Sequence, residues 1–421
     1  MKERGNFWMR FFDRYAGIPV VWFLSLVKQA NKAKGGMNPV RGAVSNGVNS
    51  ILVVKIGTIG DTLLLAPVLK AIKDAHPKAS LTVIGSKNNY EVLSRYSFID
   101  SLKVLEVSKV IKEPSYFFRF MKDVNSRAYD VVMDFESWPR LSAIVAFFVG
   151  TGRKIGFRTK GQFKHMVFDA VVPHDPLRHE MDNYISLSNV IGLGTDTQLK
   201  ISGTSLKSVA SFKMEFPISD TEKAFVEDLL KREKVPCDNL ILFHPWSSGY
   251  KGHLKEWGIE NFTKLAGVLS KDGYRIGITG TKDNQLAAEN IVNACPDNVL
   301  SFCGKFTLGQ TAYLIKKSRL LITVNTGIMH LGAALNHPML ALHGPAGVLR
   351  WGPVGSSNAY NIESDFTCAP CLNLGSEYKC RNGGCMDAIK VEVVLQKAHE
   401  ILSSRPFMGS FKNADKSATT L

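Results

Sequence analysis

Residues Ile51 to Pro77 read ILVVKIGTIGDTLLLAPVLKAIKDAHP: an apolar run breaks into two glycines and then resumes with helical spacing. Such a run is typical of a strand buried on both faces of a parallel sheet. Glycines between a strand and a helix let a ligand approach the backbone, but the dinucleotide signature needs three, spaced G-x-G-x-x-G. Only Gly57 and Gly60 are present, and the helix begins near a negative charge, Asp61. The stretch therefore predicts a βα unit whose loop faces something other than a phosphate.

The sequence allows two interpretations of Asp61. A carboxylate at a helix N-terminus is stabilised by the helix dipole and by free N–H groups, so Asp61 could simply cap the helix. It could instead point into a cleft as a general base and take a proton from an incoming hydroxyl. Spacing alone favours the cap.

An alternation of β-branched runs and amphipathic segments runs through residues 51–218 and starts again in residues 219–387. This pattern predicts an α/β fold in which parallel sheets are covered by helices on both faces. We therefore expect two doubly wound, Rossmann-like domains that face each other across a cleft at the carboxyl ends of their strands. A last helix over 388–404 is expected to pack back on the first domain, and the tail, 405–421, is expected to be disordered.

Residues 1–50 form a basic segment with eight Lys or Arg and two acidic residues. Its uninterrupted apolar stretch, Ile18–Phe23, is shorter than the roughly 20 residues that a bilayer span needs. It also lacks the cleavage site of a signal peptide. Because aromatic residues precede it, we expect an amphipathic helix that lies in an anionic membrane surface as an anchor, followed by a flexible linker. A helix that packs on the body of the protein is the alternative.

The chain of 421 residues has a formal net charge of +15, which predicts an anionic partner such as nucleotide phosphates or acidic lipid. Nucleic acid is disfavoured, because the sequence contains no helix-turn-helix, zinc finger or aromatic platform for single strands. Without a secretion signal, the expected compartment is the cytoplasm.

The segment VNTGIMHLGAALN follows the apolar run Leu320–Val324 and predicts a strand, a tight turn and a helix. Thr326 and Gly327 precede this helix, and His330 lies in its first turn. Backbone N–H groups at such a helix start bind anions, and a histidine there can donate to a phosphate oxygen. We expect the turn to bind phosphate; a capped core helix with a solvent-facing histidine is the alternative.

Polar residues follow two other predicted strands of the second half. In FHPWSSGYKGHLKEW, Ser247 and Ser248 supply hydroxyls, and Lys255 supplies a charge that could neutralise a departing diphosphate. An ordinary surface lysine is the alternative. Asp283, in TGTKDNQ, either accepts hydrogen bonds from a ribose or caps its helix.

Several signatures of other mechanisms are absent. The sequence has no Asp-x-Asp pair, so a metal-bridged diphosphate has no obvious ligands. The nearest approach is DFE, in which Asp134 and Glu136 are strand-end acids expected near the acceptor side. Walker A, G-x-S-x-G and H-E-x-x-H sequences are also missing.

Four cysteines cluster near the C-terminus with the spacing C-x2-C-x8-C-x4-C: Cys368, Cys371, Cys380 and Cys385. Four thiolates could hold a structural zinc ion, although the second interval is longer than usual. Disulfides and free thiols remain the alternatives.

Taken together and in order, KIGTIGDTLLLAPVLKAIK, HPWSS…KEW, GTKD and VNTGIMHLGAALNHPMLALHGP resemble family 9 glycosyltransferases, the group that includes the lipopolysaccharide heptosyltransferases. The resemblance extends from Ile51 to Gly355 and includes GRKIGF and RHEMDNY. It implies a GT-B fold, a nucleotide-diphosphate sugar donor bound to the second domain, and an inverting transfer that requires no metal or other cofactor.

The resemblance also implies residue roles. Asp61 matches the family's catalytic base, which reverses the preference for a cap. Lys255 and the Thr-Gly-x-x-His turn match the groups that hold the donor. Asn325 stands where family members usually carry Asp, and its amide adds no charge, so the donor sugar stays open.

The function that follows is transfer of a sugar, with ADP-heptose as the expected donor, to a lipid-linked oligosaccharide of the lipopolysaccharide core. The acceptor implies a peripheral position on the inner face of the inner membrane. A nucleotide-sugar epimerase on the same fold, or a protein that binds a nucleotide sugar without turnover, are the alternatives.

Overall fold

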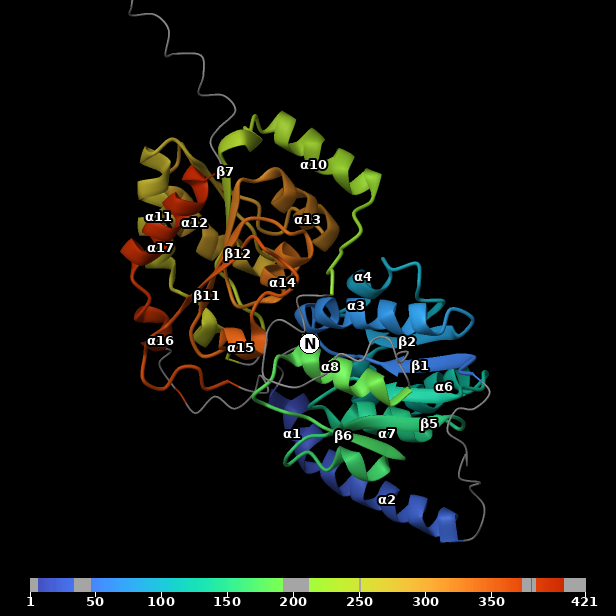
Figure 1. Cartoon of the computed structure of the whole chain (residues 1–421). Coiled ribbons are helices and arrows are strands. Elements are labelled where there is room, and N and C mark those ends of the chain that lie inside the picture. Colours follow the sequence, from blue (N-terminus) through green and yellow to red (C-terminus); the bar gives the residue numbers. More distant parts are fainter. Residues whose placement is uncertain are drawn as a thin grey trace, which may run out of the picture.

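The computed structural model describes residues 7–33, 47–191, 212–249, 251–372, 380 and 384–404, with side chains from residue 11 onward. These residues form two parallel six-stranded sheets with helices packed against them (Figure 1). The strand order is β3-β2-β1-β4-β5-β6 in the first sheet and β12-β11-β10-β7-β8-β9 in the second. Read from its other edge, the second order repeats the first, so both sheets are doubly wound. The predicted α/β fold of two Rossmann-like units is confirmed.

The first half is built on strands that are apolar runs buried on both faces, as in β1, where only Ser50 reaches solvent. The stretch 153–173 shows no clear alternation of apolar and polar residues, because buried lysines interrupt its apolar pattern. It nevertheless forms β5 and β6. One of these lysines, Lys164, is neutralised by Asp134 at 2.9 Å. The elements are β1 (Ser50–Val54), α3 (Ile59–Ala75), β2 (Ser80–Ser86), α4 (Tyr90–Leu93), β3 (Ser101–Leu105), α5 (Val107–Lys112), α6 (Pro114–Val124), β4 (Val131–Asp134), α7 (Arg140–Phe148), β5 (Arg153–Arg158), η1 (Lys164–Val167), β6 (Ala170–Pro173), α8 (Glu180–Ser188) and η2 (Asn189–Ile191).

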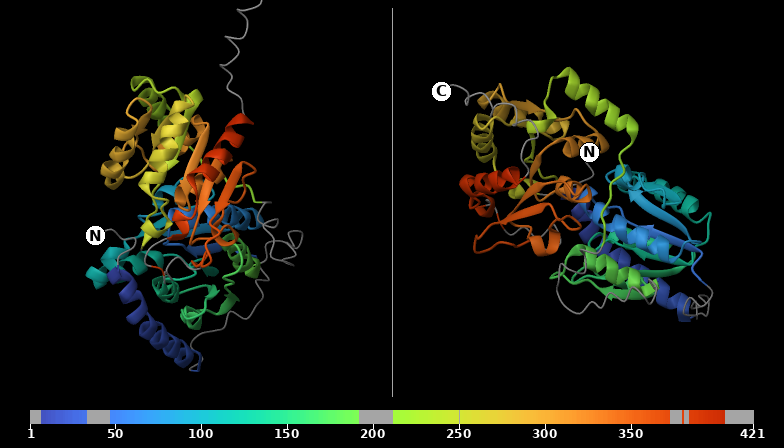
Figure 2. Two further views of the ribbon diagram at one scale, coloured as in Figure 1. Left: turned by 90° about the vertical axis from the view of Figure 1, so that its left-hand side faces the viewer. Right: turned by 45° about the horizontal axis from the view of Figure 1, so that its top comes forward.

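The N-terminal segment forms two helices, α1 (Phe7–Tyr15) and α2 (Gly17–Ala33), that pack on the first half. Val21 and Leu24 of α2 are buried in the core on the outer face of the first sheet. Asp13 accepts hydrogen bonds from the backbone of Arg140 at 2.7 Å and from its guanidinium at 2.9 Å, which ties α1 to the start of α7. Both views of Figure 2 show the second half, in yellow to red, lying away from α2, in dark blue.

The same helices leave an apolar face uncovered, with Trp22 52% and Phe23 64% exposed. One face of the segment therefore packs on the body of the protein, and the opposite face exposes large apolar side chains. The predicted linker falls largely in 34–46 and the predicted tail in 405–421, both outside the described residues.

The second half begins with α10, whose N-terminus is closed by a capping box between Ser219 and Glu222. The elements are α10 (Asp220–Arg232), η4 (Cys237–Asn239), β7 (Leu240–His244), η5 (Gly252–Lys255), α11 (Ile259–Lys271), β8 (Arg275–Ile278), η6 (Lys282–Asn284), α12 (Gln285–Ala294), β9 (Val299–Ser301), α13 (Leu308–Lys317), β10 (Leu320–Val324), α14 (Gly327–Ala334), β11 (Met339–His343), α15 (Val348–Trp351), β12 (Ala359–Glu363), α16 (Gly384–Asp387) and α17 (Val391–Ser403).

The expected packing of the last helix on the first half is wrong. Helix α17 contacts α11 and β10, both of the second half. Its buried side chains Val394, Ala398 and Ile401 belong to the core of the second sheet. The reason is the short connection from α16, which leaves α17 beside the sheet on which the chain has just finished.

The two halves meet where α3 packs on α14. Their contact forms part of one continuous core, in which Leu63 and Leu64 of α3 are clustered with Met329 and Leu331 of α14. Both helices follow strands of their sheets at the carboxyl end, so this contact brings the two predicted functional turns together.

Candidate active site

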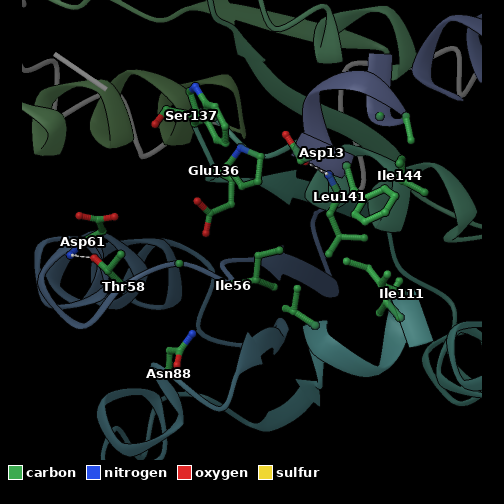
Figure 3. A pocket seen from close by; sticks show the side chains of 18 of the residues that line it. Asp13, Ile56, Thr58, Asp61, Asn88, Ile111, Glu136, Ser137, Leu141 and Ile144 are labelled. Atoms are coloured by element: carbon green, nitrogen blue, oxygen red, sulfur yellow. Dashed lines mark hydrogen bonds between the residues drawn. The ribbon is translucent and has the colours of Figure 1, made fainter. Parts of the chain in front are cut away.

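The β1–α3 turn places Asp61 differently from the cap interpretation. Helix α3 is capped by Thr58, whose side chain accepts a hydrogen bond from the backbone N–H of Asp61 at 3.3 Å. Asp61 is the third residue of the helix, so the cap interpretation is wrong and its carboxylate is not used to begin α3. Figure 3 shows that carboxylate at one side of a cavity that Asp61 lines.

We call this space of about 610 Å³ the apolar cavity. It lies between the N-terminal helices, α5, α7 and the β1–α3 turn, with Trp351 contributed by the second half. Its apolar wall includes Val20, Ile56, Val110, Ile111, Leu141 and Ile144.

Gly57 and Gly60 lie so close to neighbouring side chains that a Cβ atom would not fit at either position. A Cβ atom on Gly57 would lie 2.9 Å from Oε1 of Glu136. A Cβ atom on Gly60 would lie 2.8 Å from Cδ2 of His330, in the second half. The two glycines therefore let the loop of Asp61 touch both the acidic strand end of β4 and the start of α14, rather than a phosphate.

Beneath this loop lies a buried charge cluster that sequence reasoning missed. The Lys55 ammonium donates to the Tyr184 hydroxyl at 3.0 Å and lies 3.6 Å from Oε2 of Glu136. Burial acts to lower the pKa of Lys55, but Glu136, Tyr184 and Asp61 outweigh it, and the pKa is raised well above its usual value. Lys55 is therefore a permanent cation under two carboxylates. Its only signal in the sequence is a lysine that ends an apolar strand.

Glu136 is the second carboxylate of this wall. Burial raises its pKa, Lys55 opposes that shift, and the charges of Asp61 and Asp134 add to it. Oε1 of Glu136 is buried and has no hydrogen-bond partner among the residues that the structure describes. A buried acceptor without a partner can take a hydrogen bond from a ligand hydroxyl.

In the second half, His330 lies directly across from Gly60. Burial, with smaller contributions from His179, His343 and Lys255, lowers the pKa of His330 to about 3. The ring is therefore neutral, and its Nδ1 is buried without a hydrogen-bond partner in the described part of the chain. Thr326 precedes α14 but its side chain makes no capping bond, so its hydroxyl is left for other contacts, and Gly327 is packed on Ile59.

The loop after β7 contributes Ser247, Ser248 and Lys255. Lys255 is close enough to His330 to lower its pKa, so the structure brings these two predicted residues together. Oγ of Ser247 is buried without a partner among the described side chains, while Ser248 is exposed. Asp283 is exposed after β8 and does not cap η6, since Thr281 does.

Asn325 is engaged inside the second half. Its amide nitrogen donates to the carbonyl oxygen of Trp351 at 3.1 Å and lies 3.2 Å from Nδ1 of His343. The other ring nitrogen of His343 pairs with Oδ1 of Asn361 at 3.0 Å. Asn325 thereby fixes the backbone of Trp351, which lines the apolar cavity.

A second set of residues missed by sequence reasoning joins the two halves. The Arg350 guanidinium lies 2.6 Å from Oε2 of Glu180, which also pairs with His174 at 3.0 Å. Nε2 of His179 donates to the carbonyl oxygen of Gly352 at 3.1 Å. These buried contacts set the position of one wall relative to the other.

The four clustered cysteines line a small cavity of about 20 Å³, and none of them forms a disulfide in the described structure. Burial raises the pKa of Cys385 to about 11, and the other three thiols add to the shift. Among the described residues, no group of His, Cys, Asp or Glu is arranged to hold a metal ion. A structural zinc ion was one of three alternatives for this cluster, and no step of the reaction is routed through a metal.

Comparison with known proteins gives the family. The model of glycosyltransferase family 9 (heptosyltransferase) matches residues 117–381, more than half of the chain. The chain belongs to glycosyltransferase family 9. It is an enzyme of the glycosyltransferase class, and the GT-B assignment of its two-sheet fold is confirmed.

Curated relatives of this family 9 glycosyltransferase are heptosyltransferases. The chain is 22% identical over 302 residues to lipooligosaccharide heptosyltransferase 2 of Haemophilus influenzae, covering 70% of this chain and 83% of the relative. It is 24% identical over 315 residues to lipopolysaccharide heptosyltransferase 2 of Escherichia coli K12, with the same coverage.

Solved structures of the family share the fold. A family 9 glycosyltransferase from Veillonella parvula superposes with a TM-score of 0.70 at 19% identity, covering 85% of this chain and 98% of that one. E. coli ADP-heptose lps heptosyltransferase II superposes with a TM-score of 0.65 at 20% identity, covering 84% and 99%. Within the described ranges of the family 9 glycosyltransferase, no helix combines the length and apolar character needed to cross a bilayer.

Proposed function

We propose that this family 9 glycosyltransferase moves a heptose from ADP-heptose to a lipid-linked precursor of the lipopolysaccharide core. The observation that carries the proposal is the contact of the Asp61 turn with the His330 turn, on facing walls. The nature of the donor is supported by two structures of E. coli heptosyltransferase WaaC, one with ADP and one with ADP-2-deoxy-2-fluoro heptose. The relatives act on lipooligosaccharide or lipopolysaccharide by name.

In the proposed reaction the acceptor hydroxyl gives its proton to Asp61 as its oxygen attacks the anomeric carbon of the donor. The bond from that carbon to the phosphate oxygen breaks, and ADP leaves on the opposite side. A single displacement of this kind inverts the anomeric configuration. Asp61 acts alone as base, because Glu136 is held beside Lys55 at 3.6 Å and is placed to accept a hydrogen bond from the sugar.

The second half would stabilise the departing ADP. Lys55 is committed to the acidic wall, so we assign the diphosphate to Lys255, whose charge contributes to the lowered pKa of His330. The first backbone N–H groups of α14, the hydroxyls of Thr326 and Ser247, and a ring N–H of neutral His330 can donate to its oxygens. We propose that the nucleoside and the sugar of the donor lie beside Ser248, Asp283 and Asn325. The main effect of Asn325 is to hold the backbone of Trp351 in place.

We propose further that the enzyme is peripheral on the inner face of the inner membrane, held at an anionic surface by α1 and α2. The exposed Trp22 and Phe23 support this position. Replacing both with serine should reduce co-sedimentation with vesicles that contain anionic lipid. The same double change at Leu286 and Val393, exposed on the second half, is the control. Deleting residues 1–50 is a poor test, because it would also remove Val21 and Leu24 from the core.

The test of the main proposal uses the full chain, ADP-heptose and an acceptor glycolipid. The acceptor is extracted from membranes whose lipopolysaccharide lacks the outer core. We expect release of ADP that depends on the acceptor, with a mass gain of one heptose on the glycolipid. A thermal-shift panel of nucleotide sugars should show the largest stabilisation with ADP-heptose. Epimerised or free sugar without acceptor would indicate an epimerase. Binding of ADP-heptose without any turnover would indicate a non-catalytic protein.

A further inference from the structure

The apolar cavity differs at its two ends. Figure 3 shows Asp61 on one side, Ile111, Leu141 and Ile144 on the other, and Glu136 between them. The polar end holds the carboxylate of Asp61 and the unpaired Oε1 of Glu136. Trp351 also lines the cavity, and its Nε1 is buried without a hydrogen-bond partner in the described structure. The space therefore presents hydrogen-bonding groups beside Asp61 and hydrocarbon beyond them.

The apolar end contains one charged group, and that group is neutralised. Asp13 lines the cavity, but its carboxylate accepts from the backbone N–H groups of Arg140 and Leu141 and pairs with the Arg140 guanidinium. Sugar hydroxyls placed at this end would lose hydrogen bonds to water and find few partners. A second sugar unit is therefore a poor occupant of the apolar end.

Three cavity residues also reach the protein surface. Phe12 of α1 is 44% exposed, Val20 of α2 is 39% exposed and Ile111 of α5 is 45% exposed. Val20 lies three positions before Phe23 on α2, so these two exposed side chains lie on the same side of that helix. The cavity is therefore lined in part by apolar side chains of α1, α2 and α5 that are also exposed to solvent. Phe12 and Val20 lie outside the residues that the family model matches.

We propose that the apolar cavity binds a hydrocarbon chain of the lipid-linked acceptor while the accepting hydroxyl lies beside Asp61. The proposal rests on the proposed function, because it takes Asp61 as the base. The volume of about 610 Å³ lies within the usual range for ligand pockets. Burial of a chain there would let the enzyme select a lipid-anchored sugar over the same sugar free in solution.

The test is a series of alkyl glucosides with methyl, hexyl and octyl chains, each below its micelle concentration, bound to the full chain. Affinity is followed by isothermal titration calorimetry in the presence of ADP. Because a buried methylene contributes about 0.8 kcal/mol, affinity should rise roughly fourfold per methylene, or about fifteenfold from hexyl to octyl. Equal affinity for the methyl and octyl compounds would overturn the proposal.

Ile144→Trp fills the cavity from α7 and should reduce the hexyl-to-octyl gain to less than twofold while ADP binding is unchanged. Val110→Trp fills it from α5 and serves if the first variant does not fold. Val393→Trp, exposed on α17, is the matched control and should keep the full gain. A full gain in folded Ile144→Trp and Val110→Trp would mean that the chains adsorb on the outer face, and would overturn the proposal.

The outcomes separate this inference from the proposed function. Chain-length dependence without transfer from ADP-heptose would leave the cavity as a lipid site and reject the proposed donor or acceptor. Transfer that is equally efficient, by kcat/KM, on an intact glycolipid and on its deacylated form would support the proposed function and reject the cavity as the chain site.

Discussion

The two sheets have the same strand order, but the side chains at their carboxyl ends differ in charge. In the first sheet, chain order reverses between β1 and β4, which are followed by Asp61 and Glu136. In the second sheet it reverses between β7 and β10, which are followed by Lys255 and His330. Ligands of open α/β sheets bind at such reversals. The fold therefore supplies two equivalent positions, and the side chains make one acidic and the other neutral to cationic.

The buried groups beneath each position explain how the difference is maintained. On the acidic wall, Lys55 lies under Asp61 and Glu136 and compensates part of their charge. On the other wall, burial keeps His330 neutral, and Lys255 supplies a positive charge. One wall suits proton removal and the other suits an anion, which is the division of work that a displacement reaction requires.

The largest effect on this division between the two walls is expected from Asp61→Asn. We expect kcat to fall by about 10²- to 10⁴-fold, because the amide cannot accept the hydroxyl proton. The Kd for ADP should stay within about twofold, since the nucleotide is held by the other wall. Steady-state kinetics and calorimetry measure the two effects separately. Equal losses of turnover and ADP affinity would show that Asp61 belongs to the donor site.

Much of this arrangement was predictable from local sequence. The run Ile51–Val54 followed by glycines indicates β1 and α3, and the same logic finds β10 and α14. Spacing favoured Asp61 as the cap of α3 and did not find Thr58, although both are good capping residues and they lie three positions apart. Their hydrogen bond, from the N–H of Asp61 to Thr58, settles it.

The parts that sequence did not predict depend on partners far apart in the chain. Lys164 looks like a surface residue until Asp134 is placed 2.9 Å away. Arg350 and Glu180 are 170 residues apart, and only their meeting at 2.6 Å shows that the two halves are joined there. The apolar cavity is likewise made by α1, α2, α5 and α7 together, so no single segment carries its pattern.

The next largest effect concerns the contact that holds the two walls in place. Burial alone would raise the pKa of Glu180, but Arg350 and His174 outweigh it and hold the pKa well below its usual range. Glu180 is thus ionised at all working pH values, and its stabilisation would be lost only in strong acid. Glu180→Ala should reduce the free energy of unfolding by about 3–5 kcal/mol, because Arg350 is left buried without its partner.

Urea unfolding at pH 7.5 measures this loss. The control is Glu227→Ala, which removes a partner of Lys317 in a half-exposed pair and should cost less than about 1 kcal/mol. Similar losses in the two variants would mean that the Arg350–Glu180 contact does not join the halves in solution.

Lys255→Ala tests the opposite wall. A hydrogen bond to a charged group contributes about 1.5–3 kcal/mol, so the Kd for ADP should rise roughly ten- to a hundredfold. The effect should weaken as salt is added, because the interaction is between charges. Lys264→Ala, exposed on α11, is the control and should leave the Kd unchanged. A fall in kcat with an unchanged Kd would place Lys255 with Asp61 instead.

The smallest effect is expected at Asn325, which holds the backbone of Trp351, the residue of the second half that lines the apolar cavity. Nε2 of His343 donates to Oδ1 of Asn361, so its Nδ1 is an acceptor and requires a donor. The Asn325 amide is that donor, and it also donates to the carbonyl oxygen of Trp351. An aspartate at this position would place a carboxylate, which cannot donate a hydrogen bond, beside two acceptors, Nδ1 of His343 and the carbonyl oxygen of Trp351.

Asn325→Asp should therefore lower the free energy of unfolding by about 1–3 kcal/mol at pH 8. The new carboxylate would raise the pKa of His343, so below that pKa the ring gains a second N–H and pairs with Asp. The loss should then be smaller at pH 6 than at pH 8, because a raised histidine pKa stabilises the folded state at low pH and that contribution disappears as pH rises. Urea unfolding of both proteins at the two pH values measures the difference, with Asn293→Asp, exposed on α12, as the control. A loss that is the same at both pH values would mean that the Asn325 amide faces His343 with its oxygen, and that Trp351 is held by other contacts.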